Sequence, residues 1–222
     1  MSDELAPELR RALADLLLGL VDTKQQLGYR YAEWCTGAPT LEAATAASAM
    51  AQAELGHSRA MLPLLDAFGD LLPAEALGDQ RQITRAAPGL ELSFAGWTDF
   101  IAANTIIDGV LTTLFELATS STYKPLQSRT RKMIEEERYH SAHGQGWTLK
   151  LARGGGSAVE LLRTRVAELL DATLGWLESF DIDTLAQAGV LSGGRDELRS
   201  RFLQRLQPTL KACGLADEAL AR

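Results

Sequence analysis

Glu137-Arg138-Tyr139-His140 and Glu54-Leu55-Gly56-His57 are the two stretches of this sequence that decide its fold. Each places a glutamate three residues before a histidine, and residues three apart on an α-helix lie on the same face. The chain has only three histidines, so two of them stand in this pattern. Two such pairs on separate long helices, with one carboxylate from each of two further helices, form the ligand set of a dinuclear metal site inside a four-helix bundle.

The composition favours an all-helical chain. Hydrophobic residues make up 46% of the 222 residues, and Ala and Leu are far commoner than Val and Ile, which favours helix over sheet. This length suits one domain with a substantial core. We therefore expect a single helical domain over residues 1–222, with a core bundle at about 4–153 and additional C-terminal helices at about 157–213.

Charge and cysteine usage exclude several classes of protein. The net charge of −7 argues against nucleic-acid and anionic membrane partners, which select for basic surfaces. Cys35 and Cys213 match no zinc or redox spacing. No apolar run approaches the roughly 20 residues of a membrane span, and the acidic start of the chain has no signal-peptide pattern. We expect a cytoplasmic protein with no membrane partner.

Apolar periodicity and helix breakers place the elements. Thr40 is the expected N-cap of the second helix, and Ser157 with Glu160 is the expected capping box of the fifth. Short connections join the first helix to the second and the third to the fourth, whereas residues 69–95 form a long segment with one short helix. This connectivity is ferritin-like. The long helices are expected at about 4–34, 40–68, 97–119, 125–154, 157–180 and 195–213, with a short one at 184–188.

A third acidic residue completes the predicted metal site. Asp108 follows Ile106 and Ile107 on an apolar stripe, where a carboxylate is costly unless it is paired or bound to a cation. Two alternatives remain open: Asp108 bonds to backbone or to an arginine, and the Glu-x-x-His pairs lie on solvated faces. The predicted metal ligands are Glu54, His57, Asp108, Glu137 and His140.

The same motifs resemble a known family. The run Glu33-Trp34-Cys35-Thr36-Gly37-Ala38-Pro39-Thr40-Leu41, with Ala53-Glu54-Leu55-Gly56-His57, Asp108-Gly109 and Glu136-Glu137-Arg138-Tyr139-His140, resembles the ferritin-like subunits of phenylacetyl-CoA epoxidase. The resemblance covers about residues 19–155. The Trp34-to-Glu54 and Asp108-to-Glu137 spacings are similar to those of the catalytic subunit. The Glu-Trp-Cys turn is more similar to the non-catalytic partner subunit, which has lost its metal ligands.

The resemblance implies a fold, a chemistry and a partner. The fold is an all-α ferritin-like four-helix bundle, and the activity is a metal-dependent monooxygenase acting on an aromatic acyl-CoA in phenylacetate catabolism. Iron is the metal implied, although carboxylate and imidazole ligands also suit Mn and Zn. A homo- or heterodimer with a related helical subunit is expected. The alternative is a non-catalytic structural subunit that serves assembly.

Lys24 departs from the family pattern. Counting back from Trp34 without a gap, it stands where the family has its first glutamate ligand, and only a two-residue slip would bring Asp22 there. Four carboxylates balance two divalent ions. With Lys24 among three carboxylates, one divalent ion gives neutrality, as do two protonated histidines without metal, whereas two ions leave an excess of +2 in a low-dielectric interior. The hypothesis is a mononuclear or metal-free site in which Lys24 forms ion pairs.

The remaining candidates are weaker. His143 lies one turn beyond His140 and is expected at the surface or beside the ligands. Tyr139, Trp97 and Trp147 are expected in the core. A basic cluster could meet a CoA phosphate, and a solvated face is the favoured alternative; its members are Arg129, Arg131 and Lys132.

Overall fold

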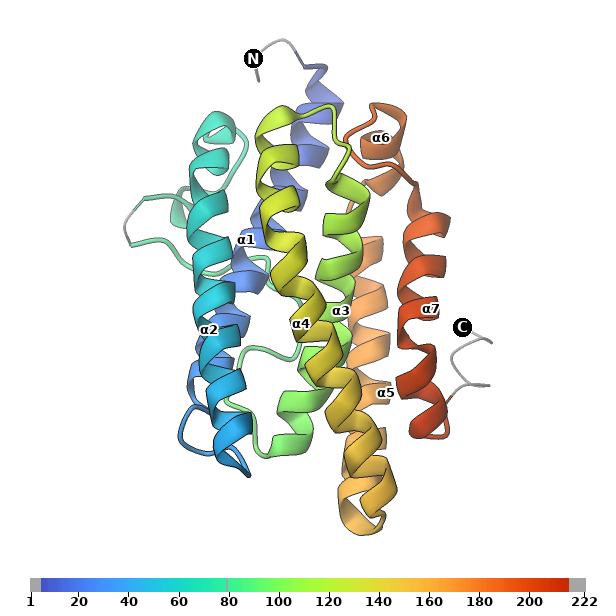
Figure 1. Ribbon diagram of the computed structural model, residues 1–222. Coiled ribbons are helices and arrows are strands. Elements are labelled where there is room, and N and C mark those ends of the chain that lie inside the picture. Colours follow the sequence, from blue (N-terminus) through green and yellow to red (C-terminus); the bar gives the residue numbers. More distant parts are fainter. Residues whose placement is uncertain (1–4, 79, 216–222) are drawn as a thin grey trace.

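A computed structural model describes residues 5–78 and 80–215, and this part of the chain is all-α without a strand (Figure 1). The first four long helices form the predicted ferritin-like bundle, in which α1 pairs with α2 and α3 with α4. Helices α5 and α7 pack against α3. The elements are α1 (Pro7–Ala32), α2 (Leu41–Met61), the 3-10 helices η1 (Leu62–Phe68) and η2 (Ala74–Ala76), α3 (Trp97–Ala118), α4 (Lys124–Gly154), α5 (Gly156–Glu178), α6 (Ile182–Gln187) and α7 (Arg195–Ala212).

One of the two helix starts predicted from capping residues is confirmed by the structure. The side chain of Thr40 accepts a hydrogen bond of 3.2 Å from the Ala43 amide, so the predicted N-cap is confirmed. The predicted capping box at Ser157 is wrong, because α5 already begins at Gly156 and has Gly155 as its N-cap residue. The φ of 64° at Gly155 is a backbone conformation that favours glycine. The second helix ends as an α-helix at Met61 and continues through Pro63 as η1. The predicted start of the first helix at residue 4 lies outside the described residues.

Helix α3 is the centre of the molecule. Among the described residues it alone is long and apolar enough to span a membrane, but 94% of the qualifying stretch is buried inside the protein. It packs against α4, α5, α7 and, more weakly, α1. Its apolar composition is therefore that of a core helix.

The long connection between α2 and α3 is tied to the outer side of α1 by Asp22. This carboxylate is fully buried and accepts hydrogen bonds from the Thr84 amide at 2.8 Å and the Arg85 amide at 2.7 Å, with Arg81 as its ion-pair partner. Next to it, the Thr23 hydroxyl accepts from the Ala87 amide at 2.9 Å. Asp22 thus anchors the crossover, and the alternative that placed it among the metal ligands is wrong.

Candidate metal centre

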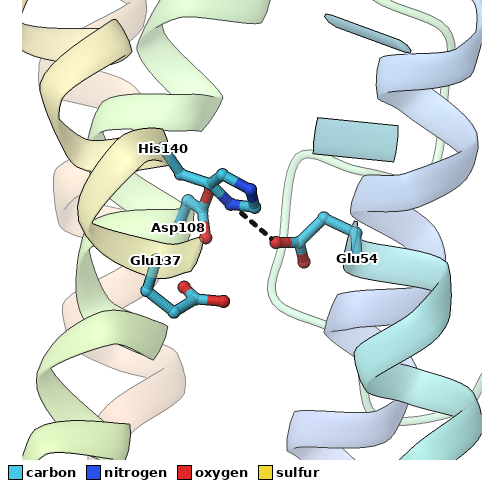
Figure 2. A group of neighbouring side chains, drawn as sticks. All are labelled: Glu54, Asp108, Glu137 and His140. Carbon is cyan, nitrogen blue, oxygen red and sulfur yellow. Dashed lines mark hydrogen bonds and ion pairs between the residues drawn. The ribbon is translucent and has the colours of Figure 1, made fainter. Parts of the chain in front are cut away.

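Five charged side chains meet in the middle of the bundle, and we call them the buried charge cluster: Lys24, Glu54, Asp108, Glu137 and His140. Each of the helices α1 to α4 contributes at least one of them. Figure 2 shows Glu54 of α2 pointing across the bundle toward the side chains of α3 and α4. None of the five is more than 3% exposed.

Lys24 holds the three carboxylates together. Its Nζ lies 2.8 Å from Glu54 Oε1, 3.1 Å from Asp108 Oδ1 and 2.7 Å from Glu137 Oε1. The ammonium has three donors, and each carboxylate accepts one of them. The apolar stripe of α1 thus directs Lys24 into the cluster, and its side chain does not extend to solvent.

His140 supplies a second contact to two of the same carboxylates. Its Nδ1 lies 3.0 Å from Asp108 Oδ2 and 3.0 Å from Glu54 Oε1. Asp108 Oδ2 also accepts from the Asn104 amide at 3.2 Å and from the Tyr31 hydroxyl at 3.4 Å. Asp108 is therefore bonded to cations and polar side chains from three helices, and the alternative of a backbone or arginine partner does not apply.

His57 lies beside the cluster and links it to the surface. Its Nε2 is 2.8 Å from Oε2 of Glu136, whose side chain is 57% exposed. Its Nδ1 is 3.0 Å from Glu137 Oε1, a contact that is not aligned as a hydrogen bond. The four side chains whose ligand atoms all lie within 4.8 Å of one another are Glu54, Asp108, Glu137 and His140, so His57 stands outside the closest group of predicted ligands.

Sequence reasoning missed three polar side chains that support these carboxylates. Asn104 and Thr112 lie four residues before and after Asp108, and the Thr112 hydroxyl donates to Glu137 Oε2 at 3.2 Å. The i±4 spacing around a predicted buried acid would have indicated both, because those positions share its helix face. Tyr31 carried no such signal, since it comes from α1.

Burial and charge shift the pKa values within the cluster. Burial alone would lower the pKa of Lys24, but Asp108, Glu137 and Glu54 outweigh it and hold that pKa far above its usual range. Burial likewise opposes protonation of His140, yet Asp108 raises its pKa to about 11. Burial raises the pKa of Glu54, and Asp108 adds to this, whereas Lys24 and His140 hold the pKa of Asp108 far below normal despite its burial. The cluster thus contains two protonated cations facing three acids.

The type and spacing of the donors would allow them to hold a metal ion. Three carboxylates and an imidazole are ligands that iron, manganese or zinc accepts. The Lys24 ammonium, however, already contacts one oxygen of every carboxylate in the group. Two metal ions would add four positive charges to a buried site in which Lys24 supplies one, and such an excess does not fit the three acids present.

The weaker candidates lie outside the cluster. His143 Nδ1 is 3.1 Å from the Asn104 side-chain oxygen, so it sits beside the ligands, and its pKa is lowered to about 4 by burial and by the His140 charge. Arg129 and Arg131 donate to backbone carbonyls, of Ala60 and Thr119 respectively, at 2.6 Å and 2.8 Å.

The aromatic side chains divide between the interior and the surface. Trp97 and Trp147 are half-buried and pack edge to face, with ring centroids 5.1 Å apart. Tyr139 is 76% exposed, so its predicted place in the core is wrong. Tyr139 lies between the two buried positions Glu137 and His140 on α4, and the helical rotation of about 100° per residue turns it outward.

The chain resembles known proteins over most of its length. Residues 1–219 match the family described as phenylacetic acid catabolic protein. One of the subunits of 1,2-phenylacetyl-CoA epoxidase from Escherichia coli (strain K12) is 28% identical over 177 residues, which cover 78% of this chain and 71% of that protein.

Proposed function

This chain belongs to the phenylacetic acid catabolic protein family, and from that premise we propose that it is a non-catalytic subunit of an epoxidase-type oxygenase complex. In this proposal Lys24 stands where catalytic members have a glutamate ligand, and its ammonium takes the place of the metal. The subunit keeps the ferritin-like bundle and serves assembly.

The contacts of Lys24 carry the proposal. Its Nζ lies within 3.1 Å of an oxygen from each of three buried carboxylates, so it compensates one of their three negative charges from inside the chain. A protonated His140 adds a second positive charge. Lys24 and His140 thus compensate two of the three negative charges, and the raised pKa of Glu54, caused by its burial, eases protonation of the remaining acid. The site therefore approaches charge balance without a metal.

The proposal assigns the oxygen chemistry to another subunit. Dinuclear oxygen activation draws electrons from both metals, and a site charged by Lys24 accommodates at most one ion. The aromatic acyl-CoA would therefore react in a related helical subunit in the cytoplasm, with this chain as its homologous partner. The similarity to a protein named as a subunit of an epoxidase supports this assignment.

A second candidate is favoured by one observation. The ligand atoms of Glu54, Asp108, Glu137 and His140 all lie within 4.8 Å of one another. If Lys24 withdrew from them, the four residues would hold a single ion, most simply iron, in an altered oxygenase subunit. One ion with three acids and Lys24 also gives a neutral site.

Metal content per chain tests the proposal. The purified wild type, Lys24→Glu and the exposed control Lys132→Glu are loaded with Fe(II) or Mn(II), desalted and measured by elemental analysis. We expect no bound metal in wild type and control, and up to two ions in Lys24→Glu. One ion in wild type would favour the second candidate, and two ions would refute the charge argument.

A further inference from the structure

Two adjoining hollows lie between α2 and α4 on the surface of the bundle. The larger one, of about 670 Å³, is lined on the α2 side mainly by small residues, and its α4 side includes Tyr139. We call it the apolar groove. A smaller hollow of about 410 Å³ lies further toward the N-terminal end of α4. His57 and Glu136 line both hollows, so the two meet at this ion pair.

The smaller hollow carries two cations that no acid of the described chain neutralises. These are Arg129 and Lys132, and we call this hollow the basic hollow. Within residues 5–78 and 80–215, neither has a carboxylate oxygen within 4.0 Å, although the whole chain has a net charge of −7. The acid that lines the hollow, Glu136, contacts His57. Uncompensated positive charge in a hollow attracts an anion.

Arg129 is held ready for such an anion. Its Nε donates to the Ala60 carbonyl of α2 at 2.6 Å, and its Nη1 donates to the Pro125 carbonyl of α4 at 2.9 Å. Its Nη2 donates to no group in the described part of the chain. One corner of an ordered guanidinium therefore remains for a ligand, and little side-chain entropy is lost when that corner binds.

The contact between His57 and Glu136 indicates which anion the junction of the hollows accepts. His57 Nε2 lies 2.8 Å from Glu136 Oε2, and this nitrogen carries the hydrogen because an ionised carboxylate only accepts. The side chain of His57 is 8% exposed, whereas that of Glu136 is 57% exposed. The imidazole is thus a buried donor that already binds a carboxylate. Glu136 is free to turn toward solvent, since a partly exposed ion pair contributes little to stability.

We propose that these two hollows form a binding site for an amphipathic monocarboxylate of medium chain length. The ligand's carboxylate takes the place of Glu136 at His57 Nε2. In that position it also meets Nη2 of Arg129 and the ammonium of Lys132. The ligand's apolar body extends from there into the apolar groove. The inference goes beyond the proposed function, because this site lies outside the buried charge cluster and needs neither a metal nor a second subunit.

The apolar groove has room for the body of this ligand. A Cβ added at Gly56 would meet no atom within 4 Å, so the groove is open at this position of α2. On the opposite side Tyr139 is 76% exposed, and an alkyl chain that covered its ring would remove apolar surface from water. Lys132 and Tyr139 are seven residues apart on α4, a rise of about 10 Å. A chain of about the length of octanoate spans this distance.

Calorimetric titration of the full chain with octanoate tests the ligand class. We expect saturable binding with a Kd below about 1 mM. Acetate lacks the apolar body and octylamine reverses the charge, so both are expected to bind at least about tenfold more weakly. Absence of saturable octanoate binding, or an equal affinity for octylamine, would overturn the proposal.

Filling the groove tests where the body lies. Gly56→Leu adds a side chain where the structure leaves space, so the fold is retained and octanoate binding should weaken more than about tenfold. Gly146→Leu makes the same change at an open glycine of α4 that does not line the groove, and it is the matched control. An unchanged affinity in Gly56→Leu would refute the placement of the body.

Charge variants at exposed positions of α4 test the carboxylate end. Lys132→Glu should weaken octanoate binding about tenfold. Glu136→Gln removes the competing carboxylate and should strengthen binding about three- to tenfold, with Glu135→Gln as the matched control. Weaker binding in Glu136→Gln would show that an acid holds the ligand and would refute the proposal. Metal content is a separate measurement, so a failure to bind octanoate leaves the metal-free assignment standing.

Discussion

Replacing Lys24 by methionine keeps an unbranched side chain of similar length but removes the ammonium that contacts three buried carboxylates. The site would then restore part of its charge balance by taking up a proton, most readily on Glu54, whose pKa is already raised. Holding a carboxyl with an ordinary pKa of 4.5 protonated at pH 7 costs about 3.4 kcal/mol. This agrees with the roughly 3–5 kcal/mol measured when one partner of a buried ion pair is removed.

The same mechanism predicts how the loss depends on pH. Because the proton that replaces the ammonium becomes easier to hold as pH falls, the difference in unfolding free energy between wild type and Lys24→Met should shrink by about 1.4 kcal/mol per pH unit from pH 7 toward pH 5. Urea unfolding followed by circular dichroism at several pH values measures this difference. Lys132→Met, which removes an exposed lysine of α4, is the control and should change stability by less than about 0.5 kcal/mol.

Two results would refute this explanation. A loss below about 1 kcal/mol at pH 7 would mean that Lys24 does not stabilise the carboxylates in the folded chain. A large loss that stays constant from pH 7 to pH 5 would mean that packing, and not charge, accounts for the effect.

Three further perturbations have definite expected outcomes. Because the pKa of His140 rises from 6.5 to about 11 on folding, the folded chain keeps a proton that the unfolded chain releases. The stability gained from this proton is fully present below pH 6.5, and the unfolding free energy should fall by up to about 1.4 kcal/mol per pH unit as pH rises above 6.5. Urea unfolding of His140→Gln should show a weaker dependence of stability on pH. An equal dependence in wild type and variant would contradict the raised pKa of His140. Asp22→Ala removes the acceptor of the Thr84 and Arg85 amides and should lower the unfolding free energy by about 2–5 kcal/mol. Hydrogen exchange should accelerate at these two amides. Unchanged protection of both amides would argue against the role of Asp22 as the anchor of the crossover. Gly144→Ala should lower the unfolding free energy by about 1–3 kcal/mol, because the new Cβ would lie 2.9 Å from the Asn104 and Thr105 side-chain oxygens. The control Gly146→Ala lies on the same helix, and its Cβ would meet no atom within 4 Å. It should raise the melting temperature, with an increase in unfolding free energy of up to about 1 kcal/mol.

The fold class and several members of the buried charge cluster could be predicted from helical patterns in the sequence. Helical periodicity fixes which side chains share a face of one helix, and this is local information. The prediction of four inward-facing helices with a charged centre therefore followed from the two Glu-x-x-His pairs, from Asp108 next to Ile106 and Ile107, and from Lys24 on an apolar stripe. The connection lengths predicted the ferritin-like order of these helices, which the structure confirms.

Tertiary structure alone decided which partner each of these side chains meets. Periodicity gives the face of a helix but neither its rotation against its neighbours nor the depth of a position, so the choice of Lys24 over Asp22 for the centre depended on packing. The same holds for His57, which contacts Glu136 and lies outside the closest ligand group, and for Tyr139, which is exposed. An ion pair between helices depends on distances that are set only when all four helices pack, and no spacing within one helix encodes them.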